Sequence, residues 1–275
     1  MKVEKRFVGF IVEHPWKTLV VGFLLFFVLG PGAQKLHPDF TYRVWFNDDD
    51  PLMVEFDAFE RRFGNDDRAV VIVHSPSGIF DQDSMKLMTE LTEQMWLAPD
   101  VIRVDSIVNF NWVHSEEDEL IVEPLIPDDV PVTDAILENR KSVALNHETL
   151  PDYMVSKDGT IAILYATTKP VLGGSPDPSR FLNGVTREDG TYQRGARAIA
   201  DALQRTDHEI MMTGGPVLNL SFKEAAQKDI QGVLPFVFGL VLLTLLLLFR
   251  RLSGLLLPIL LMILSIGSTM GLGGL

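Results

Sequence analysis

Residues 230–249 read IQGVLPFVFGLVLLTLLLLF, and residues 252–275 read LSGLLLPILLMILSIGSTMGLGGL. Neither run contains a charged residue, and Arg250 and Arg251 stand between them. About 20 apolar residues in a helix, at 1.5 Å per residue, cross the ~30 Å hydrocarbon core of a bilayer. We therefore expect two membrane-spanning helices, 230–249 and 252–275, joined by a tight turn. Because Lys and Arg are enriched in cytoplasmic loops, the Arg pair places this turn in the cytoplasm.

The amino-terminal segment predicts another span over residues 15–34. Residues 18–34 are uncharged, and Trp16 precedes them as an interfacial aromatic residue. A signal peptide cleaved near the small residues 30–33 is the alternative, although Glu4 and Glu13 do not suit such a leader. Residues 1–14 combine an apolar face with several Lys and Arg residues. They predict either an amphipathic helix on the cytoplasmic membrane surface or a disordered basic leader.

The middle of the chain is strongly acidic. Residues 33–230 carry 18 Lys and Arg against 35 Asp and Glu, whereas the whole chain has a net charge of −13. A surface of this sign argues against nucleic acid as a partner, because phosphates require a basic surface. We expect residues 35–229 to form a soluble α+β domain outside the cytoplasm.

The first half of this domain predicts one β-α-β unit. Residues 40–46 have an extended pattern, and a helix is expected after Pro51, capped by the preceding aspartates rather than following a calcium loop. A β-branched run at 69–74 predicts a buried strand. A helix over 81–97, capped by Asp83 or Ser84, and a strand over 101–112 complete the unit.

The helix over 81–97 carries a stripe of Met85, Met88, Leu91 and Met95 at helical spacing. We interpret this stripe as core, with a ligand-binding surface as the alternative.

The second half of the domain predicts another β-α-β unit. After a helix over 132–145, Asp158-Gly159 predicts a hairpin with a type I′ turn between 153–157 and 160–167. A loop over 173–179 precedes a helix over 195–204 with four apolar residues on one face. A strand over 209–213 ends the unit.

Residues suited to chemistry are sparse. The chain has no cysteine, and no GxSxG, P-loop, GxGxxG or HExxH motif occurs. We therefore predict no enzyme activity, no catalytic or metal site and no cofactor. The six histidines show no pair at helical spacing; they are His14, His37, His74, His114, His147 and His208.

The order of these features resembles the RND (resistance–nodulation–division) superfamily, and more closely its MmpL-like hydrophobe and amphiphile exporters. The resemblance is carried by short motifs in sequence order: His14-Pro15-Trp16, residues 47–52 (NDDDPL), residues 63–67 (FGNDD), residues 104–109 (VDSIVN), Gly214-Gly215-Pro216 and Arg250-Arg251. It implies a porter-type, ferredoxin-like loop domain within a longer transporter of two similar halves. This chain resembles the amino-terminal part, and the proton-relay acids of the family lie on spans beyond residue 275.

The resemblance implies part of a proton-driven exporter of lipids or other hydrophobic compounds in the cytoplasmic (inner) membrane. Its partners would be the lipid bilayer, the substrate, the remainder of the transporter and further copies of the chain. An RND-like accessory protein for secretion, a sterol-sensing relative and a membrane-tethered binding module are the alternatives. The residues that bind substrate are not identified by the sequence.

The basic residues predict an orientation that labelling can measure. Because the chain has no cysteine, Gly174→Cys and Ser253→Cys each introduce a single thiol. On intact cells, a membrane-impermeant thiol reagent should label position 174 and spare position 253 until the cells are opened. Labelling at 253 alone would reverse the orientation.

Overall fold

A computed structural model describes residues 9, 13–36, 45–47, 49–63, 68–116, 119–127, 131–169, 177–250 and 252–274. The predictions for 1–14, 40–46 and 173–179 lie wholly or mostly outside these residues. The chain divides into two compact units. We call residues 40–224 the loop domain, and residues 1–39 with 225–275 the helical unit.

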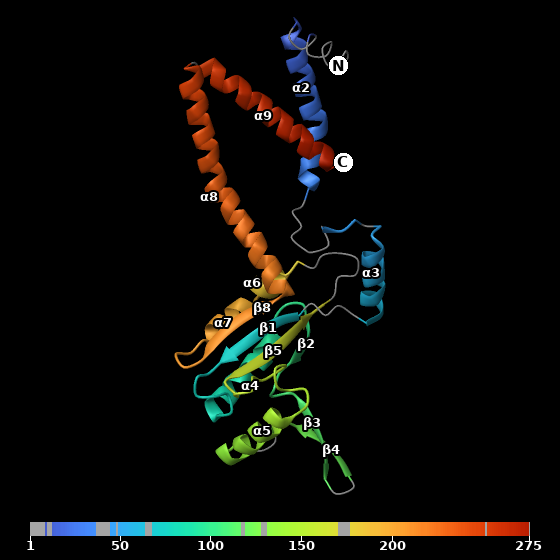
Figure 1. Ribbon diagram of the computed structural model, residues 1–275, viewed down its shortest axis with the longest axis vertical. Helices are drawn as coiled ribbons and strands as arrows, with labels where there is room; N and C mark the ends of the chain where they lie inside the picture. Colours follow the sequence, from blue (N-terminus) through green and yellow to red (C-terminus); the bar gives the residue numbers. More distant parts are fainter. Residues whose placement is uncertain are drawn as a thin grey trace. The chain divides into compact units, whose positions relative to one another are not determined.

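The loop domain is organised around a four-stranded antiparallel sheet. Its strands are β1 (Arg68–His74), β2 (Val101–Asp105), β5 (Ile161–Thr168) and β8 (Glu209–Gly214), in the order β2-β5-β1-β8 (Figure 1). Strands β1 and β2 are therefore parallel to each other with β5 between them, and β5 and β8 are likewise separated by β1.

Two helices make the connections that this order requires. Helix α4 (Gln82–Trp96) links β1 to β2, and α7 (Ala196–Leu203) precedes β8. The two predicted β-α-β units are thus present. However, the two strands of each unit are not neighbours, because a strand of the other unit lies between them. Sequence patterns do not specify which strands become neighbours.

The core lies between this sheet and the two helices. Ala69, Val71 and Val73 of β1 alternate into it, and so do Ala162, Leu164 and Ala166 of β5. The predicted apolar face of α7 is confirmed, because its buried residues are Ala196, Ile199, Ala200 and Leu203. Alternate side chains of the strands and one face of the helix therefore pack together in a single core.

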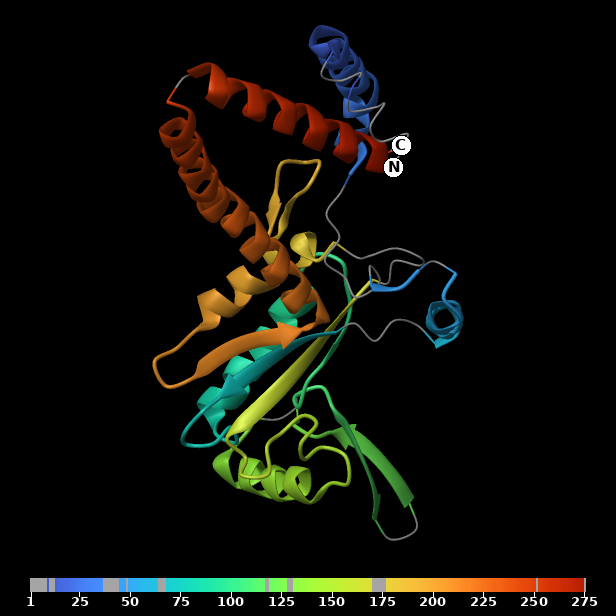
Figure 2. The same cartoon turned by 45° about the horizontal axis from the view of Figure 1, so that its top comes forward.

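A second group of elements is inserted between β2 and β5. It consists of the hairpin of β3 (Asn111–Glu116) and β4 (Glu119–Pro124), followed by α5 (Asp134–Asn146) (Figure 2). The predicted single strand over 101–112 is wrong, because a turn at 106–110 divides it into β2 and the start of β3. Ser106 and Asn109 form this turn through side-chain hydrogen bonds, a local chemistry that the β-branched pattern conceals.

The turn at Asp158-Gly159 also differs from the prediction. Only Gly159 has positive φ, at 72°, whereas a type I′ turn needs positive φ at both central residues. Gly159 N–H donates to Ser156 O, and Asp158 Oδ1 accepts from the Thr160 backbone and hydroxyl. The hydroxyl of Ser156 also donates to Asp158 Oδ1, and this bond, followed by those from Thr160, lowers the pKa of the Asp158 carboxyl to about 2. In the predicted first arm, residues 153–157, only Val155 is strand-like, through isolated bridges to Pro151 and Ala162.

The remaining elements of the loop domain are short. Helix α3 (Pro51–Phe63) begins beside Asp50, whose Oδ1 accepts from Leu52 N at 2.9 Å, as the capping prediction requires. Helix α6 (Ser179–Asn183) and the small hairpin of β6 (Val185–Thr186) and β7 (Tyr192–Gln193) were not predicted.

Helices make up the helical unit. They are α2 (Pro15–Leu29), which continues as the 3₁₀ helix η1 (Gly30–Lys35), the greater part of α8 (Gly215–Phe249), and α9 (Leu252–Gly273). By length and composition, Pro15–Lys35 and Gly215–Phe249 suffice to cross a membrane, and Pro258–Gly273 is a shorter apolar helix.

Glycines let α9 approach α2 and η1 closely. A Cβ atom at Gly267 would collide with the Phe26 ring, and one at Gly271 would collide with the backbone carbonyl of Leu29. Small residues with this spacing are typical of close helix contacts in membranes. The small-residue motif at 267–271 therefore serves packing.

This packing yields a prediction for α9. Gly271→Leu should separate α9 from α2, since overpacking costs about 1–3 kcal/mol and the obstructing atoms here belong to backbone. In a chain carrying Gly22→Cys and Leu264→Cys, whose positions lie in contact, oxidative cross-linking should fall severalfold. Gly273→Leu is the matched control, because nothing lies within 4 Å of a Cβ there, and it should cross-link like the parent. Equal yields from both variants would contradict the packing.

Candidate functional site

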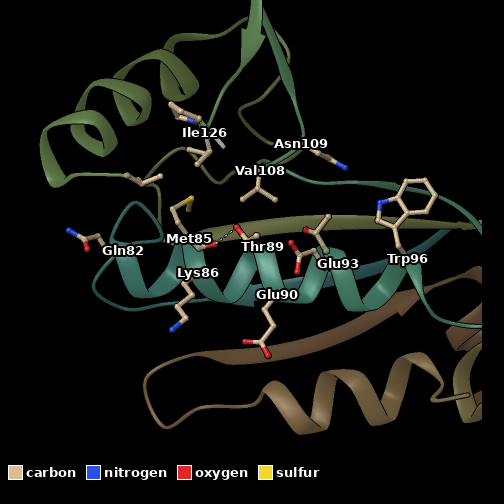
Figure 3. Close-up of a pocket in the computed structure, with 13 residues that line it drawn as sticks. Gln82, Met85, Lys86, Thr89, Glu90, Glu93, Trp96, Val108, Asn109 and Ile126 are labelled. Atoms are coloured by element: carbon tan, nitrogen blue, oxygen red, sulfur yellow. Dashed lines mark hydrogen bonds between the residues drawn. The ribbon is translucent and has the colours of Figure 1, made fainter. Parts of the chain in front are cut away.

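The face of α4 that turns away from the sheet borders a cavity of about 760 Å³ (Figure 3). Its opposite wall is formed by the 106–110 turn and the segment between β4 and α5. The lining residues are Gln82, Met85, Lys86, Thr89, Glu90, Thr92, Glu93, Trp96, Val108, Asn109, Ile126, Pro127 and Val132. Cavities of this size suit small amphiphilic or apolar molecules.

The 106–110 turn is held by a polar network that starts on α4. Thr92 Oγ1 and Ser106 Oγ are hydrogen-bonded at 2.9 Å, and Ser106 N–H donates to Asn109 Oδ1 at 2.8 Å. Asn109 Nδ2 donates back to Val104 O at 2.8 Å. Ile107 is buried in the core, so the next residue, Val108, is presented to the cavity. One wall of the site is therefore rigid.

The other wall is fixed by contacts between the inserted hairpin and α5. The Arg140 guanidinium lies 4.7 Å from the centre of the Trp112 ring and pairs with Glu123 Oε1 at 2.9 Å. At the amino-terminal end of α4, Gln82 Nε2 donates to Asp134 Oδ1 at 2.8 Å. This bond joins the first turns of α4 and α5 and closes that end of the cavity.

The polar groups inside the cavity are largely engaged. Thr89 Oγ1 donates to Met85 O at 2.9 Å, drawn as a dashed line in Figure 3, and Thr92 Oγ1 also reaches Met88 O at 2.6 Å. Lys86 and Glu90 point away from the inserted elements in this view. The walls offer carbon from Met85, Val108 and Ile126, with Trp96 at the far end. Polar side chains, among them Glu93 and Asn109, share the lining.

A chain of polar side chains anchors the start of α4. Asp81 caps the helix through Ser84 N at 2.8 Å, so the predicted caps Asp83 and Ser84 are wrong by two or three positions. Ser84 Oγ donates to Asp81 Oδ2 at 2.7 Å and lies 2.8 Å from His208 Nε2. The His208 Nδ1 atom is 3.0 Å from Asp207 Oδ1, and the imidazole lowers the pKa of the Asp207 carboxyl.

Serine, histidine and aspartate in this order resemble a hydrolase triad, but the chemistry differs. Ser84 and His208 are buried, and the Ser84 proton is committed to Asp81. The hydroxyl can then only accept from the imidazole, which is the reverse of nucleophile activation. The chain of bonds instead ties α4 to the segment before β8.

The structure divides the predicted methionine stripe between two roles. Met88, Leu91 and Met95 are fully buried in the core, which confirms the core interpretation for them, whereas Met85 also borders the cavity. Among the described residues, no three His, Cys, Asp or Glu side chains are grouped to hold a metal ion. The sequence offered no signal for Ile126, Pro127 and Val132, because only the tertiary placement of the insertion brings them to α4.

A family model described as the MMPL family matches residues 44–275, which is most of the chain. The chain belongs to the MMPL family. No curated protein matches the sequence.

Membership in the MMPL family confirms the resemblance seen in the sequence motifs and makes the chain a membrane protein of RND type. One of these motifs, residues 104–109, is the segment that forms the rigid wall of the cavity. Ser106, Val108 and Asn109 thus belong both to a motif that carries the family resemblance and to the wall of the cavity.

The hydrogen bonds of the 106–110 turn yield a prediction for Asn109. Asn109→Ala removes the acceptor of Ser106 N–H and the donor to Val104 O, and leaves buried partners unpaired. It should destabilise the loop domain by about 1–3 kcal/mol, measured by urea unfolding followed by circular dichroism. Asn111→Ala, at an exposed position on β3, is the matched control and should change stability by less than about 0.5 kcal/mol. Equal effects of the two substitutions would refute the role of Asn109.

Proposed function

We propose that the chain is part of a proton-driven RND-type exporter and that the α4 cavity holds the apolar part of its substrate. The substrates would be lipids or other hydrophobic and amphiphilic compounds. The observation that carries the proposal is a cavity with a partly apolar lining in a chain of the MMPL family.

The strand order supports the assignment of the loop domain as a porter domain. An antiparallel sheet ordered β2-β5-β1-β8, with helices in its two split β-α-β connections, follows the ferredoxin-like pattern. In such a domain the substrate would be held and passed on without covalent chemistry.

Orientation and coupling complete the proposal. The amino terminus and Arg250-Arg251 would face the cytoplasm, and the loop domain would lie outside the inner membrane. The apolar runs 230–249 and 252–275 contain no Asp, Glu, Lys, Arg or His. The proton relay would therefore be supplied by other parts of the transporter, since coupling requires a titratable group within the membrane.

A blocking substitution tests the cavity. Val108 points into the cavity, so Val108→Trp should fill it. The full chain in lipid nanodiscs would be irradiated with a neutral long-chain alcohol carrying a diazirine, and labelled peptides would be mapped by mass spectrometry. The wild-type protein should be labelled saturably on α4 and residues 106–109, and Val108→Trp should lower this labelling by about fivefold or more.

The control for this experiment is Val113→Trp, which adds the same ring at a half-exposed position on β3. It should leave labelling of α4 unchanged, and circular dichroism should show that both variants fold. Non-saturable labelling, or equal labelling of the wild type and Val108→Trp, would reject the cavity as a substrate site.

A further inference from the structure

A second cavity, of about 570 Å³, lies at the carboxyl-terminal end of α4, where the β6–β7 hairpin reaches the helix. Its chemistry differs from that of the α4 cavity because it contains two arginines and a tyrosine. The lining residues are Gln94, Trp96, Leu97, Arg187, Thr191, Tyr192, Gln193, Arg194 and Ile199.

The two arginines of this cavity have neutral partners. Arg187 Nε donates to Gln193 Oε1 at 3.2 Å, and Arg194 Nη2 donates to Gln94 Oε1 at 2.9 Å. Within the described part of the chain, no carboxylate lies within 4.0 Å of either guanidinium. Other arginines of the loop domain do form such pairs, namely Arg103, Arg140, Arg180 and Arg197.

Asp189, two positions after Arg187, interacts with the charge of Arg187 without forming an ion pair with it. Hydrogen bonds from Thr191 lower the pKa of the Asp189 carboxyl most, and the positive charge of Arg187 lowers it further. Asp189 Oδ1 accepts from Thr191 N at 2.9 Å and from Thr191 Oγ1 at 2.6 Å, so its carboxylate is engaged within the hairpin turn. Glu90 accepts from Gln94 Nε2 at 3.2 Å and reaches Arg194 only through that amide. In an acidic domain, two arginines that form no ion pair with any described residue are available to an anion from outside the protein.

Several contacts fix the hairpin that carries these arginines. Gln193 Nε2 donates to Leu97 O at 2.8 Å, and Tyr192 OH donates to Asn183 O at 2.5 Å. Gly195 has no room for a side chain, because a Cβ atom there would collide with the backbone of Gly184 and Leu182. The arginines are thus presented at defined positions before any ligand arrives, which reduces the entropic cost of binding.

Trp96 joins the two cavities. Its side chain lines both of them and is 46% exposed. Trp96 lies seven positions after Thr89, which is about 10 Å along the helix. A partly apolar cavity and a basic cavity therefore follow one another along α4, with the Trp96 indole between them.

We propose that Arg187 and Arg194 bind the anionic headgroup of an amphiphile whose chain passes Trp96 into the α4 cavity. The headgroup would be a phosphate, sulfate or carboxylate, the groups that guanidinium donors match in charge and geometry. This inference rests on the proposed function, because the chain of the ligand occupies the site described there.

The test compares an anionic amphiphile with one ligand that has only the alkyl chain in common with it and another that has only the phosphate. The full chain would carry Trp16→Phe, Trp45→Phe and Trp112→Phe, so that Trp96 is its only indole. In nanodiscs of zwitterionic lipid, with empty nanodiscs as reference, Trp96 emission would be titrated with decyl phosphate, decyl maltoside and inorganic phosphate below micellar concentrations. Decyl phosphate should bind about tenfold or more tightly than either of the others.

Removing the arginines separates the two subsites. Arg187→Gln with Arg194→Gln should reduce affinity for decyl phosphate to that for decyl maltoside, and leave decyl maltoside unchanged. Arg61→Gln with Arg62→Gln on α3 removes the same charge and should keep the preference. Added salt should weaken decyl phosphate binding to the wild type and not decyl maltoside binding.

Three other outcomes would each overturn a stated part of the proposal. Equal affinities of the wild type for decyl phosphate and decyl maltoside, or equal losses in the two double variants, would overturn the headgroup site and leave the proposed function standing. Arginine-dependent binding of phosphate as tight as that of decyl phosphate would show a free-anion site and overturn the amphiphile. Absence of decyl maltoside binding would contradict the proposed function itself.

Discussion

The burial of one face of α4 against the sheet is the constraint on which the rest of the loop domain depends. Met88, Leu91 and Met95 are fully buried over strands that present alanine and valine. Burial of each such side chain is worth roughly 1.5–3 kcal/mol, so this contact supplies a large part of the net stability of a domain. Because the inward face of α4 is fixed in this way, its outward face can serve as a rigid wall for both cavities.

Polar networks then set the position of α4 along its own axis. The Asp81, Ser84 and His208 chain anchors its beginning, and Gln193 and Arg194 of the hairpin contact its end. The inner members of these networks are buried and bonded, so a shift of the helix would leave unsatisfied groups behind. Apolar packing stabilises the helix against the sheet, and directional bonds select its register.

The sequence predicted those elements whose signal is local and repeated. The strand predicted from the β-branched run at 69–74 and the apolar face of α7 matched the structure. Residues 230–249 and 252–273 are helical as their composition predicts. Errors arose where a few side chains override a pattern. Ser106 and Asn109 break an apparently continuous strand, and Asp158 keeps negative φ in a dipeptide that favours a different turn.

The candidate site could not be derived in this way. The Met85 side of the cavity was visible as part of a helical stripe, but its opposite wall comes from an insertion that is distant in sequence. The interleaving of the two β-α-β units brings β5 between β1 and β2, and this order depends on the whole sheet. Contacts between segments distant in the chain leave no periodic pattern in the sequence from which they could be predicted.

The composition of the two cavities suits transfer of a ligand better than its retention. The carbon walls of the α4 cavity give a non-directional attraction that falls gradually as a chain withdraws. The arginines of the second cavity are exposed to solvent, where screening keeps their interaction with an anion weak. A transporter needs binding that is favourable enough for entry and weak enough for release. An open apolar wall that ends in two solvated guanidinium groups meets both requirements, whereas a closed pocket with a buried charge would hold its ligand.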